Sequence, residues 1–563
     1  MTSTPQAELL FHNGPVFTAD GTPEPARSAA VAVADGRILA VGPDALDLAG
    51  PGTERVDLDG RLLVPGFQDS HIHAVFGGLE LGRCDLSSLR TADEYLAAIA
   101  GYARANPEQE WITGGGWSLE SFPGGLPTAA ALDAVVPERP VFLPNRDHHG
   151  AWVNSRALEL AGITRDTPDP ADGRIERDGN GEPIGMLQEG AVTLVESLLP
   201  KISTQEYDAA FDRAQALLHS LGITGWQDAL VGAGIGLPDN FDVYLRAAVS
   251  SRLTARVRGA LWWERERGAE QIEGLLERRR AGRGAGNGRF DPGSVKIMQD
   301  GIVENRTAAL NSPYFEPCAC RGHGSAARDG GGSGGSGSGL SFVDPAKLGG
   351  YVAELDRLGF QVHFHALGDR AVREALDALE AALEANGVLG HRHHLAHLQV
   401  VHPEDVPRFA ALGATANIQP LWACHEPQMD ELAIPLLGPE RAQWQYPFLS
   451  LLASGAELAA GSDWPVTSPD PIQGMHVAVN RVAPGEQGEA LIPAEKLTLA
   501  QALTAYTAGS ARVNHADQAG RIAPGMLADL AVLDRDPFSA PEQEIHLARV
   551  AATYVAGQAV FQV

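Results

Sequence analysis

Cysteine, lysine and positive charge are all scarce in this chain of 563 residues. Its four cysteines have no regular spacing, which argues against a disulfide scaffold and favours a reducing, cytoplasmic location. Lysine and arginine together number 43 against 71 acidic residues, so the formal net charge is −28. Because so acidic a surface repels polyanions, we expect neither nucleic acid nor an anionic membrane as a partner.

Long apolar stretches are also missing. The sequence has no uninterrupted run of about 18 apolar residues, so no transmembrane helix is expected. Residues 1–7 lack the basic segment and the apolar stretch of a secretory signal. Hydrophobic residues make up 44% of the chain and charged residues 20%, a composition typical of a globular protein with a large core.

Both ends of the chain are rich in strand patterns. Residues 1–64 alternate short apolar runs with turn dipeptides such as Asp35-Gly36 and Asp59-Gly60. Residues 519–563 repeat this alternation. We therefore expect one small β domain that is assembled from both termini, and two separate β appendages are the alternative.

The long middle segment, residues 65–518, alternates apolar β-type runs with longer helical patterns. This alternation predicts a parallel sheet with crossover helices. A closed barrel of eight strands needs about 250 residues, so about 200 remain for insertions. We place most of this surplus within about residues 75–290, and we interpret the Gly/Ser-rich segment 321–339 as a flexible loop.

The motif with the strongest chemical content ends an apolar run at His71-Ile72-His73. Alternate residues of a strand point to one face, so the two imidazoles can share one divalent metal ion. Such a pair is weak evidence alone, but at the carboxyl end of a barrel strand it lies where active sites form.

Three more predicted strands end in metal-ligand types. One carries His363 and His365, the next His394 and His397, and the last ends in Asp463. Any of these alone is explained as well by a core histidine or a turn aspartate. Four strand ends that present ligands together favour a metal centre.

Lys296 lies between Val295 and Ile297 in another predicted strand, so it faces the opposite side from these two residues. An ammonium group inside a barrel is costly unless it is paired. Two explanations stay open. Lys296 pairs with Asp300 or Glu304, or its neutral amine reacts with carbon dioxide to give a carbamate that bridges two metal ions.

Taken in order along the chain, these motifs resemble the amidohydrolase superfamily, in particular its type-3 branch, which includes N-substituted formamide deformylases. The resemblance rests on residues 65–73, 148–155, 295–301, 365–371, 397–403, 461–466 and 520–530. It implies a (β/α)8 TIM barrel with a composite β-sandwich domain. It also implies a divalent metal, usually zinc, with one or two ions per chain.

The resemblance carries over to individual residues. It makes His71 and His73 the ligands from the first strand, Lys296 the carbamylated bridge, and His365 and His397 ligands of the second metal. Asp463 matches both a metal ligand and the catalytic acid/base. His363 falls outside the motif match and is expected to support the ligands.

The substrate is harder to define from the sequence. We expect His149, Gln419, Trp422 and Trp464 to line the mouth of the site, although the tryptophans could equally belong to an insertion core. Such a lining fits a small neutral amide, and we expect hydrolysis of a non-peptide carbon–nitrogen bond by metal-activated water. An N-substituted formamide is the specific expectation, while cyclic amides, other N-acyl compounds or a deamination are alternatives. A non-catalytic regulatory protein on the same barrel is the alternative of another class, and a homodimer is the expected assembly.

A second metal site is conceivable at Cys318, Cys320 and His323, which offer three ligands within six residues. A fourth ligand is not evident, and a structural zinc site normally has four. A reduced, flexible loop is therefore the simpler interpretation of this segment.

Overall fold

Eight parallel strands form the centre of the molecule in the computed structural model, which describes residues 6–234, 238–286, 288–316 and 337–563. Their spatial order is β19-β18-β17-β16-β15-β14-β13-β6. Most of their residues are buried, as expected for strands covered on both faces. The strands are β6 (Phe67–Ile72), β13 (Ile223–Val231), β14 (Arg256–Trp262), β15 (Phe290–Met298), β16 (Gln361–Ala366), β17 (His394–His397), β18 (Thr415–Ile418) and β19 (Glu457–Ala460).

The segments after β6 and β19 bring the two edges of this sheet together. The Asp463 N–H donates to the His71 carbonyl at 2.7 Å, and the His73 N–H donates to the Trp464 carbonyl at 2.8 Å. The sheet is therefore a nearly closed barrel, which confirms the predicted (β/α)8 architecture. All eight strands run the same way, so their carboxyl ends meet on one face.

Helices between the strands cover the barrel. They include α6 (Thr204–Ser220), α9 (Pro345–Arg357) and α10 (Asp369–Asn386). In α10 the apolar residues recur with helical spacing and are buried, while Gly387, at φ 72°, ends the helix in a conformation that favours glycine. Polar side chains accept backbone N–H groups at the starts of α6 and α9, where Ser203 and Asp344 provide the caps.

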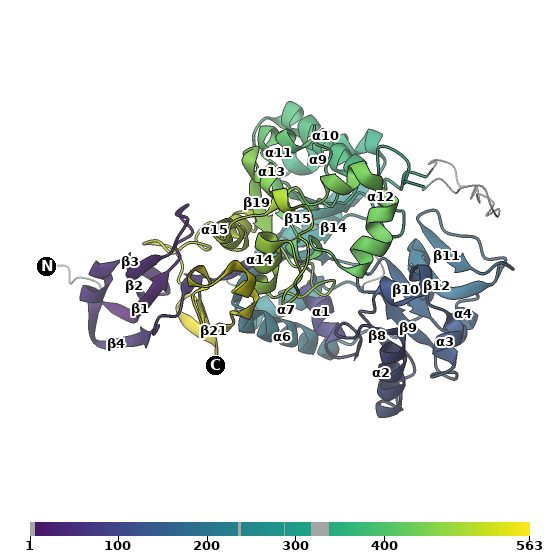
Figure 1. Cartoon of the computed structure of the whole chain (residues 1–563), viewed down its shortest axis with the longest axis horizontal. Coiled ribbons are helices and arrows are strands. Elements are labelled where there is room, and N and C mark those ends of the chain that lie inside the picture. The colour runs from purple at the N-terminus through teal and green to yellow at the C-terminus, as the bar shows by residue number, and fades with distance from the viewer. Residues whose placement is uncertain (1–5, 235–237, 287, 317–336) are drawn as a thin grey trace.

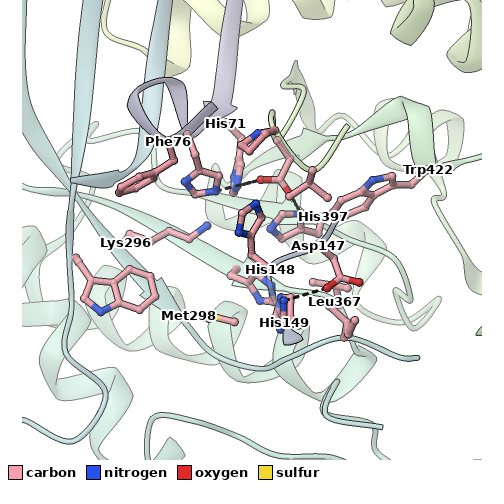
Figure 2. Close-up of a pocket in the computed structure, with 17 residues that line it drawn as sticks. His71, Phe76, Asp147, His148, His149, Lys296, Met298, Leu367, His397 and Trp422 are labelled. Atoms are coloured by element: carbon pink, nitrogen blue, oxygen red, sulfur yellow. Dashed lines mark hydrogen bonds and ion pairs between the residues drawn. The ribbon is translucent and has the colours of Figure 1, made fainter. Parts of the chain in front are cut away.

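A second sheet is inserted between β6 and β13 and lies at one end of the molecule in Figure 1. Its order is β11-β12-β10-β9-β8-β7, and its core is aromatic, with Trp117 packed edge-on against Trp152. The turn from β9 to β10 places Asp147, His148 and His149 beside residues of the barrel (Figure 2). The strands are β7 (Cys84–Asp85), β8 (Ile112–Gly115), β9 (Val141–Pro144), β10 (Gly150–Val153), β11 (Gly173–Arg177) and β12 (Pro183–Glu189).

Both termini contribute to a third sheet at the opposite end of the molecule (Figure 1). Its order is β22-β21-β20-β5-β1-β2-β3, with β4 paired to β1, and β5 pairs antiparallel with β20. The strands from the two ends of the chain therefore form one continuous sheet. They are β1 (Ala7–Val16), β2 (Ala26–Ala34), β3 (Arg37–Val41), β4 (Ala49–Asp57), β5 (Leu63–Pro65), β20 (Leu530–Leu533), β21 (Val550–Val555) and β22 (Gln558–Gln562).

Two predictions concern segments that the structure describes only in part. Cys318, Cys320 and His323 lie outside the described residues, as does most of the Gly/Ser-rich segment 321–339. The other two cysteines, Cys84 and Cys424, are buried and not disulfide-bonded. Among the described helices, none combines the length and the apolar character needed to cross a lipid bilayer.

Candidate metal centre and active site

The six predicted ligands surround one cavity at the carboxyl end of the barrel (Figure 2). They come from widely separated parts of the chain and meet because parallel strands end on the same face. His71 lies near the end of β6 and His73 directly follows this strand, while Lys296 and His365 lie near the ends of β15 and β16. His397 ends β17 and Asp463 follows β19.

Three of the histidines surround the Asp463 carboxylate. Its Oδ1 lies 3.1 Å from Nε2 of His71 and 3.1 Å from Nε2 of His73, and its Oδ2 lies 3.9 Å from Nδ1 of His397. Asp463 and His397 both have positive φ, 58° and 79°. Non-glycine residues in this conformation are uncommon and concentrate at functional sites.

Burial and charge set the protonation of these groups. Burial by itself favours the neutral Asp463 carboxyl, but His71, His73 and His397 outweigh it and hold its pKa well below the usual range. Burial, helped by the charge of Lys296, lowers the pKa of His71 to about 3. The site therefore combines an ionised carboxylate with a neutral imidazole, the forms that bind metal ions.

Several buried nitrogen atoms of the site have no hydrogen-bond partner among the described residues. They are His73 Nδ1, Lys296 Nζ, and both ring nitrogens of His397. Unpaired buried polar groups are costly and rare. Ligand atoms of His71, His397 and Asp463 also lie within 4.8 Å of one another. The donors therefore fit a divalent ion of the zinc type, which prefers imidazole and carboxylate ligands.

Lys296 forms no ion pair within the part of the chain that the structure describes. Asp300, one of its expected partners, instead accepts backbone N–H groups from Ala309, Leu367 and Gly368 and lies 3.2 Å from Nδ1 of His365. Burial lowers the pKa of Lys296 to about 7, against the opposing effect of Asp463. Burial therefore favours the neutral amine over the charged form.

A second layer of polar residues orients the ligands. His71 Nδ1 lies 2.8 Å from Nε2 of His363, whose Nδ1 lies 2.8 Å from Oε1 of Gln227. Oδ1 of Asp69 accepts the His71 N–H at 3.0 Å, and both of its carboxylate oxygens lie within 3.2 Å of the Ser462 nitrogen. A contact such as that between the His71 and His363 rings fixes the tautomer and the direction of a ligating imidazole. His363 thus supports His71, as expected from the sequence.

The inserted sheet supplies a further wall of the cavity. His149 lines the cavity, and its Nδ1 lies 2.9 Å and 3.0 Å from the two carboxylate oxygens of Glu189. Burial opposes the charged form of His149, but Glu189 outweighs this effect and raises the pKa of the imidazole. Glu189 therefore stabilises the charged form of His149 relative to a free imidazole.

Comparison with known proteins agrees with this geometry. Residues 54–561 match the amidohydrolase family. The chain belongs to this family. It is 33% identical to the protein LONG AFTER FAR-RED 3 of Arabidopsis thaliana, over 99% of this chain and 92% of that one. It is 29% identical to the N-substituted formamide deformylase of Arthrobacter pascens, over 98% of each chain.

A solved structure of an uncharacterised metal-dependent hydrolase from Pyrococcus horikoshii OT3 has the same fold. The two structures align with a TM-score of 0.71 and 25% sequence identity, over 95% of this chain and 99% of the Pyrococcus chain. The present amidohydrolase therefore has a metal-dependent hydrolase fold, and its His71, His397 and Asp463 form a cluster that could hold a metal ion.

The residues expected to line the mouth of the amidohydrolase site divide into two pairs. His149 and Trp422 line the cavity, and Trp422 stacks on His397 with ring centroids 5.2 Å apart. Trp464 and Gln419 are not among the lining residues. The side chains of these two residues pack inside the protein instead.

Close packing explains both departures. The Trp464 ring lies against Gly77, where an added Cβ would come within 2.6 Å of the indole. The Gln419 side chain accepts the backbone N–H of His397 at 2.7 Å and donates to Asn417. Gln419 therefore positions a ligand instead of contacting a substrate.

Several residues of this amidohydrolase site were not predicted from the sequence. Glu189, Gln227 and Asn417 belong to no local motif, and their roles follow from contacts with histidines far away in the sequence. Asp69 and Asp300 stand inside quoted motifs, so their carboxylates could have been suspected. Most of their partners are backbone N–H groups, which no residue pattern identifies.

Proposed function

We propose that this amidohydrolase cleaves the carbon–nitrogen bond of a small neutral amide other than a peptide, and that an N-substituted formamide is its substrate. The observation that carries the proposal is the ionised Asp463 carboxylate, which faces His71, His73 and His397 beside the Lys296 amine at the carboxyl end of the barrel. The similarity to an N-substituted formamide deformylase supports this choice of amide.

The donor set is proposed to hold one or two divalent ions, with zinc as the metal. His71, His73, His365, His397 and Asp463 would supply imidazole and carboxylate ligands. Lys296 would add two oxygen ligands as a carbamate. In that reaction the neutral Nζ attacks carbon dioxide, a carbon–nitrogen bond forms, and one proton leaves to solvent. A divalent cation bound there supplies acidified water and polarises a carbonyl.

Asp463 would perform the proton transfers. Its carboxylate accepts one proton from the attacking water and delivers it to the amide nitrogen. The carbon–nitrogen bond then breaks, its electron pair goes to the nitrogen, and the amine leaves in neutral form. Since an amine anion is a poor leaving group, hydrolysis depends on this delivery.

The remaining lining suits the apolar substituent of an amide. Phe76, Trp262, Met298, Ile302 and Trp422 give the cavity an aromatic and aliphatic wall. Such a wall excludes water and binds uncharged groups. We therefore choose N-benzylformamide, whose ring matches this wall, as the first test substrate.

The test is release of benzylamine from N-benzylformamide by the full-length protein, prepared with zinc and bicarbonate. Dihydrouracil, a cyclic amide, and N-acetylphenylalanine, an N-acyl compound, are assayed in parallel. Turnover of N-benzylformamide well above that of the other two is the expected result. Preference for one of the other two would contradict the formamide assignment. No hydrolysis of any of the three by zinc-loaded protein would contradict the proposal of amide hydrolysis.

A further inference from the structure

A chain of buried polar side chains crosses the inside of the barrel and ends at the ligand His71. It consists of two glutamines and two histidines from β13, β16 and β17, all fully buried: Gln227, Gln361, His363 and His394. Neither of these histidines lines the cavity, although both stand in strand motifs of metal-ligand types. Since buried polar groups are hydrogen-bonded, the direction of each bond in the chain can be worked out.

The amide of Gln361 is fixed in one orientation. Its Nε2 lies 2.8 Å from the carbonyl oxygen of Arg392 and 2.9 Å from that of Val513, and carbonyl oxygens only accept. On the other side, Nε of Arg258 donates to the Ser294 hydroxyl at 2.9 Å, so this hydroxyl gives its own hydrogen to Gln361 Oε1. Two backbone carbonyls and a buried arginine therefore fix this end of the chain independently.

Gln227 passes the orientation of Gln361 to the two histidines. Its Nε2 donates to Gln361 Oε1 at 3.2 Å. Its Oε1 therefore faces Nδ1 of His363 at 2.8 Å and Nε2 of His394 at 3.0 Å. Because an amide oxygen only accepts, each of these two ring nitrogens carries a hydrogen.

His394 holds Gln227 in this orientation from a second side. Nδ1 of His394 lies 3.1 Å from Nδ2 of Asn417, and the same amide nitrogen donates to the Ser70 carbonyl at 2.9 Å. Asn417 is therefore the donor, and His394 is a neutral imidazole whose one hydrogen points at Gln227. If the Gln227 amide were turned over, its N–H groups would face the N–H of His394.

The chain ends where His71 meets the metal site. Nε2 of His363 faces Nδ1 of His71 at 2.8 Å, while Nε2 of His71 lies 3.1 Å from Oδ1 of Asp463. A metal ion on Nε2 of His71 takes the lone pair of that nitrogen, so the ring hydrogen stays on Nδ1 and His363 has to accept it. The orientation fixed at Gln361 is thus the one that a bound ion requires at His71.

We propose that Gln227 and Gln361 are positioning residues for the metal centre, and that they act through His363 to keep the ring hydrogen of His71 on Nδ1 and its lone pair on Nε2. The inference rests on the proposed metal-dependent hydrolysis. Without the acceptor at Gln227, the hydrogen of a neutral His363 is free to move to Nε2. His71 would then carry its hydrogen on the nitrogen that faces the ion, and the ion would bind more weakly.

The experiment measures the zinc dissociation constant of the full-length protein by competition with a chelator, together with the midpoint of thermal unfolding. Gln227→Met keeps the length of the side chain but removes the acceptor, so zinc should bind about 10- to 100-fold more weakly. Gln227→Glu keeps an oxygen toward both histidines, so its zinc constant should stay within about threefold of the wild-type value. Burial of the new carboxyl group should lower its thermal midpoint, so a purely structural role would make Gln227→Glu the worse variant in both measurements.

A second variant and a control complete the design. Gln361→Met breaks the chain one step further from the metal and should weaken zinc binding by about 10-fold, a result that decides the matter if Gln227→Met does not fold. Gln215→Met is the matched control. This buried glutamine on α6 also uses both ends of its amide, toward the Arg252 carbonyl and the Thr254 N–H, and does not line the cavity. Gln215→Met should lower the thermal midpoint and keep the wild-type zinc constant.

The inference and the proposed function fail in different ways. Wild-type zinc affinity in both Gln227→Met and Gln361→Met would overturn the inference, as would equal weakening in Gln227→Met and Gln227→Glu. A wild-type protein that binds zinc but hydrolyses no amide would contradict the proposed function, while the zinc constants of the variants would still decide the inference. A wild-type protein that binds no zinc would contradict both.

Discussion

The Asp463 carboxylate faces three histidine rings and is proposed to act both as a metal ligand and as the proton carrier. Its position is set by the backbone, because its N–H bonds to the His71 carbonyl and its φ is 58°. Asp463→Asn keeps an oxygen that can face the metal but removes the proton acceptor. We predict that kcat falls by about 100- to 10,000-fold, while elemental analysis finds the wild-type metal content. Turnover at the wild-type rate would exclude the proton-transfer role.

Lys296 offers a second test, since it is buried without an ion-pair partner among the described residues. Lys296→Ala should lose metal and activity together, because the proposed carbamate oxygens are removed. Formate or acetate in the buffer should restore part of both, since a small carboxylate can occupy the space of the carbamate. Lys347→Ala is the control, as Lys347 has a 64% exposed side chain in a surface ion pair. Full metal content and activity in Lys296→Ala would contradict the carbamate.

The ligand types could be predicted from the sequence because each stands in a short motif at a strand end. His71, His365, His397 and Asp463 all meet at the cavity for this reason. Their supporting residues could not be predicted, since Glu189 and Gln227 become partners of histidines only through tertiary contacts. Trp464 was expected in the aromatic lining of the mouth, but its ring packs against Gly77 of the barrel, a contact that the sequence does not reveal.

Helix α1 (Ala74–Glu80) directly follows His73 in the chain. It packs against Trp464, the residue after Asp463. Gly77 lies in this helix, and an added Cβ would come within 2.6 Å of the Trp464 ring. Gly77→Ala should therefore displace Trp464, destabilise the protein by about 1–3 kcal/mol and lower kcat by up to about 100-fold through the neighbouring Asp463. Thermal unfolding and steady-state kinetics measure the two effects.

Gly101 provides the control within another helix, α2 (Ala92–Ala105), because an added Cβ there meets no atom within 4 Å. Gly101→Ala should leave kcat unchanged and stabilise the protein by about 0.5–1 kcal/mol, the usual gain within a helix. If Gly77→Ala behaved like Gly101→Ala, the link from α1 to Asp463 would be wrong.

The barrel strands were predictable because apolar runs ended in recognisable motifs and alternated with helical patterns. From the sequence, the inserted sheet was predicted only as an insertion within about residues 75–290. Its strands are as short as two residues, as in β7, and β7 to β9 pair in parallel while β9 to β12 pair antiparallel. Such pairings depend on long-range packing, which local periodicity does not encode.

The C-terminal part of the third sheet is joined to the barrel through the side chain of Asp529. Its carboxylate accepts the Ala556 N–H at 2.7 Å and lies 3.0 Å from Nε of Arg256 on β14. Asp529→Ala leaves both donors without this partner, so we predict a loss of about 1–3 kcal/mol in stability, seen as a lower midpoint of thermal unfolding. Arg27→Ala breaks an exposed pair with Asp536 and should cost less than about 1 kcal/mol. Equal midpoints for the two variants would contradict this role of Asp529.

The central claim is that the barrel's carboxyl face holds a catalytic metal, and metal content per chain tests it most directly. Elemental analysis would compare the wild-type protein with His71→Ala and His397→Ala, all purified without chelator in the presence of zinc and bicarbonate. We predict one or two zinc ions per wild-type chain and loss of at least one from each variant. Wild-type protein without metal after reconstitution, or variants with the full wild-type content, would contradict the account.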